Sequence, residues 1–95
     1  MTLEEMAPPV DSAFMSVASR RGVDATTLEA GRHVYLTDCI RCHGVEPIGR
    51  YSASMWRAIL PRMARESKLG NEATDAVEAY VMIARTVLEE AEEAD

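Results

Sequence analysis

Five consecutive residues near the middle of the chain, Cys39, Ile40, Arg41, Cys42 and His43, constrain the fold more than any other stretch. The pattern C-x-x-C-H is the attachment signature of a covalent haem. The two thiols can each add to a vinyl group of one porphyrin, and the adjacent imidazole of His43 can then bind the iron as the proximal ligand. We therefore expect one haem c, held through Cys39 and Cys42.

Two other interpretations of the cysteine pair are weaker. A thioredoxin-type dithiol needs C-x-x-C at a junction of strand and helix, and no strand-forming run precedes Cys39. A structural zinc site needs four ligands, but His33 is the only other histidine and there is no second cysteine pair. The motif favours haem over both alternatives.

The length of 95 residues suits a single domain. A domain of this size buries only about 60 to 65% of the surface that its unfolded chain exposes, so its core is small. A covalent haem would add a large apolar plate on which short helices can pack. No long apolar run is present, so no transmembrane segment is predicted. We expect an all-α fold in which about four helices enclose the haem.

Hydrophobic spacing and end signals place these helices. The first covers residues 10–21, and the second begins near Thr26, where Thr26 and Glu29 can form a capping box, and runs into the motif. The third opens at Ser52 or Ser54 and is interrupted by Pro61, and the last is capped by Asn71. Residues 1–9 are expected to be a flexible, extended segment and 89–95 a solvated acidic tail, which leaves 10–88 as the domain.

Gly31 is an unusual residue on the buried face of the second predicted helix. It shares that face with Leu28, Tyr35 and Cys39, which recur at steps of three and four residues. Glycine costs about 1 kcal/mol in a helix interior relative to alanine. Its presence therefore predicts that another helix crosses in close contact.

The same positions carry a family resemblance. The pattern Gly31-x-x-x-Tyr35-x-x-x-Cys39-x-x-Cys42-His43 resembles the amino-terminal helix of class I cytochromes c, and the chain is most similar to the small single-haem bacterial members. The resemblance implies a class I cytochrome c fold in which this glycine and aromatic pack against the carboxy-terminal helix.

Three methionines are candidates for the sixth iron ligand, because thioether ligation is common in electron-transfer haems. Met82 lies about 200° around the last helix from Tyr80 and is expected to face away from the core. Met63 precedes Tyr80 by 17 residues, a spacing similar to that between ligand and aromatic in class I cytochromes c. Met63 is therefore the predicted ligand, with Met55 second and no sixth protein ligand third. Methionines on helical stripes can also be plain core residues.

Three further residues bear on the site. The indole N–H of Trp56 needs an acceptor if it is buried, and a haem propionate is the candidate that the resemblance also suggests; a plain core role is the alternative. The resemblance suggests the carbonyl of Pro47 or a neighbour as the acceptor that orients the imidazole of His43, although Pro47 can equally be an ordinary turn residue. His33 is expected on the surface.

Charge is unevenly distributed along the chain. The net charge is −6, yet residues 20–68 hold nine bases and five acids, and five acids follow Leu88. This pattern predicts a basic rim around the exposed haem edge, near Arg41, that steers acidic redox partners. The acidic balance and the lack of a basic strip interleaved with aromatics argue against nucleic-acid binding.

The resemblance implies a protein that carries one electron at a time between larger redox proteins, with His43 and Met63 as the iron ligands. It also implies that the protein is a monomer and is not an enzyme. It also implies a periplasmic or otherwise extracytoplasmic location and a signal sequence in the precursor. The alternative is a five-coordinate haem that binds a small gas or reacts with peroxide. Peroxide chemistry needs a distal acid–base group, and the segment from Ser52 to Met63 offers only Arg57 and Arg62.

Overall fold

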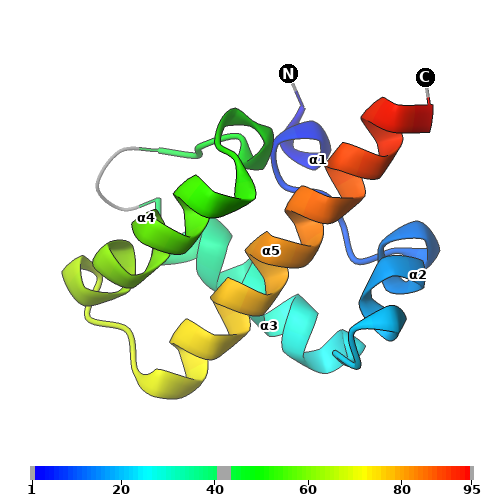
Figure 1. Ribbon diagram of the computed structural model, residues 1–95. Coiled ribbons are helices and arrows are strands. Elements are labelled where there is room, and N and C mark those ends of the chain that lie inside the picture. The colour runs from blue at the N-terminus through cyan, green and yellow to red at the C-terminus, as the bar shows by residue number, and fades with distance from the viewer. Residues whose placement is uncertain (1, 41–43, 95) are drawn as a thin grey trace.

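The computed structural model describes residues 2–40 and 44–94. Within these residues the structure is helical and has no strand (Figure 1). The elements are α1 (Leu3–Met6), α2 (Ser12–Arg20), α3 (Ala25–Thr37), the short 3₁₀ helix η1 (Ile48–Arg50), α4 (Ala53–Glu66) and α5 (Asn71–Ala94). The predicted all-α class is confirmed, and none of these helices is both long and apolar enough to cross a membrane.

The crossing of α3 and α5 organises the core. A Cβ atom added at Gly31 would lie 2.7 Å from both the carbonyl carbon of Ala76 and the Cβ of Tyr80, and closer still to the carbonyl oxygen of Ala76. The two backbones therefore touch at this point, as the glycine predicted. Figure 1 shows the long helix α5 passing across α3. The ring of Tyr80 stacks on Phe14 of α2 with 5.5 Å between ring centroids, so α2 also packs against the crossing of α3 and α5.

The amino-terminal segment is packed, which corrects the expectation of an extended chain over residues 1–9. Thr2 and Glu5 form a capping box around the single turn α1. Ala7 is fully buried, and its carbonyl accepts hydrogen bonds from the guanidinium of Arg32 at 3.1 and 3.3 Å. The Tyr80 hydroxyl donates to the carbonyl of Pro8 at 2.7 Å. These long-range partners hold a segment that has no periodicity of its own.

Short polar side chains also begin α2, α3 and α4. Asp11 caps α2 by accepting from the N–H of Phe14, and Ser52 caps α4, as predicted. Asp24, not Thr26, caps α3, because its carboxylate accepts from the N–H of Thr27 at 2.8 Å. The hydrogen bond is also the main reason that the pKa of Asp24 is lowered. A carboxylate at this position favours the positive end of the helix.

The other predicted helix ends need two corrections. Asn71 is the first residue of α5 rather than its cap, and the carbonyl of the preceding residue, Gly70, accepts from the N–H of Thr74 at 3.0 Å. The helix α4 continues through Pro61 and does not restart there, while the kink that was the other expectation stays a prediction.

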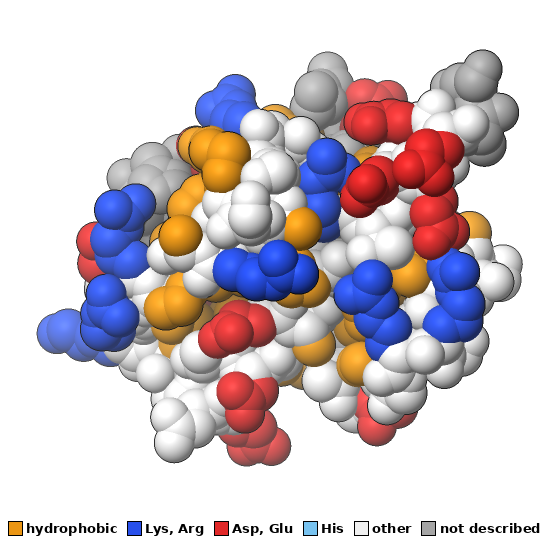
Figure 2. All heavy atoms as spheres, in the orientation of Figure 1, with side chains coloured by type: hydrophobic (Ala, Val, Ile, Leu, Met, Phe, Trp, Pro, Cys, Tyr) orange, Lys and Arg blue, Asp and Glu red, His pale blue; other side chains and the backbone are white. Residues whose placement is uncertain are grey.

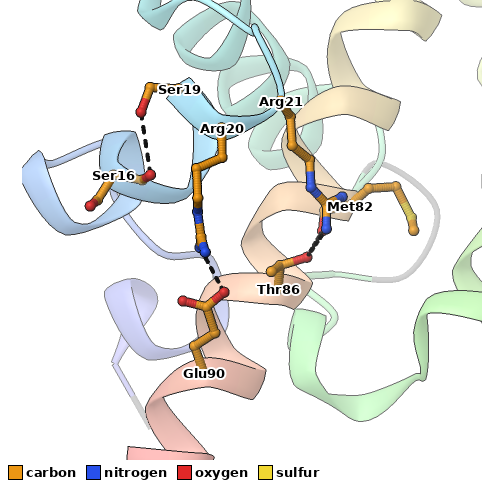
Figure 3. A network of polar contacts seen from close by, with 7 residues as sticks. All are labelled: Ser16, Ser19, Arg20, Arg21, Met82, Thr86 and Glu90. Atoms are coloured by element: carbon orange, nitrogen blue, oxygen red, sulfur yellow. Dashed lines mark hydrogen bonds and ion pairs between the residues drawn. The ribbon is translucent and has the colours of Figure 1, made fainter.

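The acidic tail continues α5 without a break, so residues 89–94 do not form a separate unit. Glu90 forms an ion pair with Arg20 of α2 at 2.7 Å, and Arg21 donates to the hydroxyl of Thr86 at 3.2 Å (Figure 3). Met82, expected to face away from the core, is partly buried on this side of α5. Residues 89–93 are exposed, as expected of a solvated segment, so only the burial of Met82 departs from the prediction.

The helix α4 ends in a left-handed turn at Lys68. Lys68 has φ of 57°, and the N–H groups of Lys68 and Leu69 donate to the carbonyls of Arg65 and Ala64 at 3.2 and 3.0 Å. This pair of bonds is a Schellman motif, in which glycine usually occupies the left-handed position. A lysine therefore holds a backbone conformation that costs about 1 to 2 kcal/mol for a residue with a Cβ.

We expect Lys68→Gly to raise the free energy of unfolding by about 1 kcal/mol, because it removes this conformational cost. Urea denaturation measures the change. Lys68→Ala serves as the control, since it removes the same charge and keeps the Cβ. Equal stability of the glycine and alanine variants would contradict the assignment of strain.

Candidate functional site

The carboxyl end of α3 carries the first cysteine of the motif. Cys39 is buried, and its N–H donates to the carbonyl of Val34 at 3.2 Å. Arg41, Cys42 and His43 lie outside the described residues. On the far side of them, the N–H of Gly44 donates to the carbonyl of Ile40 at 3.0 Å. A backbone hydrogen bond therefore joins the residue before Arg41 to the residue after His43.

The environment of Cys39 is not that of a reactive thiol. Burial first, and the charge of Asp38 second, raise the pKa of the Cys39 thiol to about 11. Dithiol oxidoreductases instead depend on a lowered thiol pKa, which supplies a thiolate at neutral pH. In the folded chain Cys39 is a protonated thiol, and this disfavours the thioredoxin-type interpretation.

Tyr35 anchors the segment that follows the motif. Its hydroxyl donates to the carbonyl of Glu46, and its ring packs on Trp56 at 6.2 Å and on Tyr80 at 6.3 Å. Burial raises the pKa of Tyr35, so the hydroxyl stays a donor at any physiological pH. Sequence reasoning treated Tyr35 only as a packing residue. The signal it missed is that a buried tyrosine hydroxyl needs an acceptor.

A pocket of about 260 Å³ opens beside this segment. Its apolar wall comes mainly from α4, and its polar groups come from α4 and from the segment after the motif; the lining residues are Glu46, Tyr51, Trp56, Ile59, Arg62, Met63 and Glu66. The structure thus brings two predicted site residues, Trp56 and Met63, to one cavity. Met55, the second candidate ligand, is 49% exposed and does not line it.

Met63 is partly buried and packs against the core through α4. The predicted ligand therefore sits on the pocket wall with its side chain neither fully sequestered nor free in solvent. Its role on an iron atom stays a prediction, because His43 lies outside the described residues. His33 is exposed, as expected.

Trp56 is buried, and its indole N–H donates to the carbonyl of Ile48 at 2.8 Å. The ring of Tyr51 meets it edge-on at 5.3 Å. The buried donor thus has an acceptor within the chain, in η1, which the sequence did not indicate. The predicted contact between Trp56 and a propionate stays a prediction.

The carbonyls suggested as acceptors for the imidazole already have donors. The Pro47 carbonyl accepts from the N–H of Arg50 at 3.0 Å and so starts η1, while the Glu46 carbonyl accepts from Tyr35. The carboxylate of Glu46 pairs with Arg50 at 2.8 Å. The turn role of Pro47, which was the alternative, is present in the structure.

Two carboxylates on the pocket wall were missed by the sequence analysis. Glu46 lies before the segment from Ser52 to Met63 that was searched for acid–base groups, and Glu66 lies after it. Glu66 is one helical turn beyond Arg62, so an (i, i+4) search along α4 would have found it. The wall therefore combines a thioether, an indole, two carboxylates and a guanidinium.

The chemistry of this lining fits part of a haem. Trp56, Ile59 and Tyr51 offer apolar surface, Met63 offers a thioether, and Arg62 offers a cation for a propionate. Arg85 holds the carbonyl of Tyr51 through Nε at 2.9 Å, and its buried Nη1 has no partner among the described residues. The volume lies below the range of about 300 to 1,000 Å³ that is usual for small-molecule sites. The pocket would therefore hold a portion of a porphyrin, not all of it.

Comparisons of the chain with protein-family models, with curated proteins and with solved structures found no match. The described residues define a helical protein with a buried cysteine after α3 and a mixed apolar and charged pocket lined by Trp56, whose ring contacts Tyr35.

Proposed function

We propose that this chain is a single-haem c-type cytochrome of class I type that carries single electrons between larger redox proteins. Cys39 and Cys42 would hold the haem, and His43 and Met63 would bind its iron. The main support is the C-x-x-C-H motif at the end of α3, together with a pocket where Met63 and Trp56 meet Glu46, three residues after the motif. The close crossing of α3 and α5 at Gly31 adds to it.

The bound haem supplies an iron that changes its oxidation state by one electron. The residues of the chain have simpler tasks. Trp56, Ile59 and Tyr51 exclude water from one wall of the pocket, and Arg62 balances negative charge at its edge. Tyr35 positions the segment after the motif through the carbonyl of Glu46. A thioether such as that of Met63 favours the reduced iron.

Glu46 and Glu66 support a second candidate function, the reaction of a five-coordinate haem with peroxide. A five-coordinate haem that reacts with peroxide needs an acid–base group near its open side, and these carboxylates share the pocket with Met63. Glu46 is already paired with Arg50, whereas Glu66 lies beside Arg62 on the wall. If the protein has this function, Met63 is a core residue and the peroxide reaction depends on Glu66.

The proposal extends to the setting of the protein. Covalent attachment of this kind implies maturation outside the cytoplasm, in the periplasm or an equivalent compartment, and transfer to and from other redox proteins as a monomer without enzymatic activity of its own.

Intact-mass measurement tests the proposal. We expect protein produced together with haem-attachment machinery to gain the mass of one haem, because the chain has one C-x-x-C-H motif. The variant with both Cys39→Ala and Cys42→Ala is the control and should gain nothing. An unmodified wild-type mass, or bound zinc, would contradict the proposed function. Rapid binding of carbon monoxide by the reduced holoprotein would instead favour the five-coordinate alternative.

A further inference from the structure

Basic residues are concentrated on α4 and its end. Residues 57–68 hold four bases, Arg57, Arg62, Arg65 and Lys68, and one acid, Glu66. The rest of the chain holds six bases and fifteen acids. A protein with a net charge of −6 thus carries one strongly positive segment.

The three arginines lie on one side of α4. At 100° per residue they fall within an arc of about 140°, and Lys68 follows the end of the helix. All four are exposed. Figure 2 shows blue side chains gathered at the left edge of the molecule, over α4, and red side chains over the end of α5 at the upper right. We call the surface of Arg57, Arg62, Arg65 and Lys68 the α4 basic face.

The α4 basic face differs from the other described bases in its contacts. Every other arginine of the described residues donates to a partner in the chain; the pairs are Arg20 with Glu90, Arg21 with Thr86, Arg32 with the Ala7 carbonyl, Arg50 with Glu46 and Arg85 with the Tyr51 carbonyl. No such hydrogen bond or ion pair joins the α4 basic face to the described residues. Its charges are therefore available to a partner molecule.

Lys68 adds a second observation. It occupies the left-handed position at the end of α4, where glycine is the favoured residue. A residue held in a sparsely populated conformation points to a function for its side chain. In this case the side chain extends the α4 basic face by one charge.

We propose that the α4 basic face is the docking surface for a partner protein with an acidic surface. The face should bind carboxylates of the partner, because its cations form no ion pair with the described residues. Ala58 and Pro61, which lie between Arg57 and Arg62 in the chain, are also exposed but are small. The face has no exposed aromatic on which bases could stack, since Trp56 is buried, and this argues against single-stranded nucleic acid. Met55 is the only exposed large apolar residue of α4, which leaves little to insert into a membrane.

The position of the face suits electron transfer. Arg62 belongs both to the α4 basic face and to the wall of the pocket that holds Met63. A partner docked on the face would therefore sit next to the proposed haem site. The role of this surface in electron transfer rests on the proposed function. The binding of an acidic partner protein to it does not.

The test compares two variants with the same change in charge. The first carries Arg57→Gln and Arg65→Gln, and it leaves Arg62 in place because Arg62 lines the pocket. The second carries Arg20→Gln and Arg21→Gln on α2, which lies on the other side of the molecule from α4 (Figure 1). Fluorescence anisotropy measures binding of a labelled oligoglutamate peptide to the holoprotein, and circular dichroism confirms that each variant is folded.

We expect the α4 variant to bind the peptide about tenfold more weakly at low salt, and the difference to shrink at about 0.15 M, where the Debye length is about 8 Å. The α2 variant should stay within about twofold of the wild type. Equal losses in the two variants, or tighter binding of oligolysine than of oligoglutamate by the wild type, would overturn the proposal. So would binding to phosphatidylglycerol vesicles without binding to the peptide. This measurement needs no redox reaction. If the intact mass shows that no haem is attached and the chain still binds the peptide through α4, the cytochrome proposal fails and the docking surface stands.

Discussion

Gly31→Val is expected to lower the free energy of unfolding by about 3 kcal/mol or more, the upper end of the usual cost of overpacking a core. Any Cβ at this position would meet the backbone of α5 at Ala76 and the Cβ of Tyr80. These are not the far ends of flexible side chains, so the two helices would have to move apart. Because Tyr80 also stacks on Phe14, that movement would loosen α2 as well. Urea denaturation followed by circular dichroism measures the loss.

Gly31→Ala separates this crossing from ordinary helix propensity. On an exposed helix face the change would stabilise by about 1 kcal/mol. At the crossing we expect it to destabilise, because even a methyl group lies too close to the Ala76 carbonyl. Ala30→Val, at the exposed neighbouring position, is the matched control and should cost well under 1 kcal/mol through propensity alone. A Gly31→Val variant as stable as the wild type would show that the helices do not touch there.

Met63→Ala is expected to remove the red-edge charge-transfer band that sulfur-to-iron ligation produces in the oxidised holoprotein. The reduction potential should fall on the order of 0.1 V, since a thioether stabilises the reduced iron and axial ligands as a group span about 0.8 V. Absorption spectra and a potentiometric titration measure the two effects. Met63 lines the pocket, which supports its choice over Met55.

Met55→Ala is the control for this experiment. Met55 lies in the first turn of α4, 49% exposed, so its removal should leave both the band and the potential nearly unchanged. Loss of the band in Met55→Ala but not in Met63→Ala would reverse the ligand assignment. A wild type without the band, whose peroxide reaction depends on Glu66, would favour the five-coordinate haem.

Local rules in the sequence predicted several features that the structure confirms. The all-helical fold follows from apolar spacing, and Ser52 was one of the two residues expected to cap α4, since a serine hydroxyl can accept from the N–H three residues on. The crossing at Gly31 was predicted because a glycine on a buried helical stripe has no other use for its missing side chain. Each of these depends on residues within one or two helical turns of each other.

The errors arose where distant residues decide the outcome. The end of the amino-terminal segment packs because Arg32 and Tyr80 supply donors for the carbonyls of Ala7 and Pro8, and no local pattern reveals such partners. The acidic residues 89–93 are exposed, as expected, although the tertiary structure also pairs Glu90 with Arg20. The cap of α3 was misplaced by two residues because Asp24 and Thr26 are both good capping residues.

The sequence by itself determined the helical fold and the close approach of another helix at Gly31, because spacing along one chain is enough to specify both. Haem attachment through Cys39 and Cys42 stays a prediction. Only the tertiary structure decided which side chains share the pocket. Met63 lies in the pocket wall, whereas Met55 is exposed. Glu46 and Glu66 lie in the same wall, and the indole N–H of Trp56 donates to the Ile48 carbonyl. These outcomes depend on how α4 and η1 fold back toward α3, and contacts between elements far apart in the chain set that arrangement.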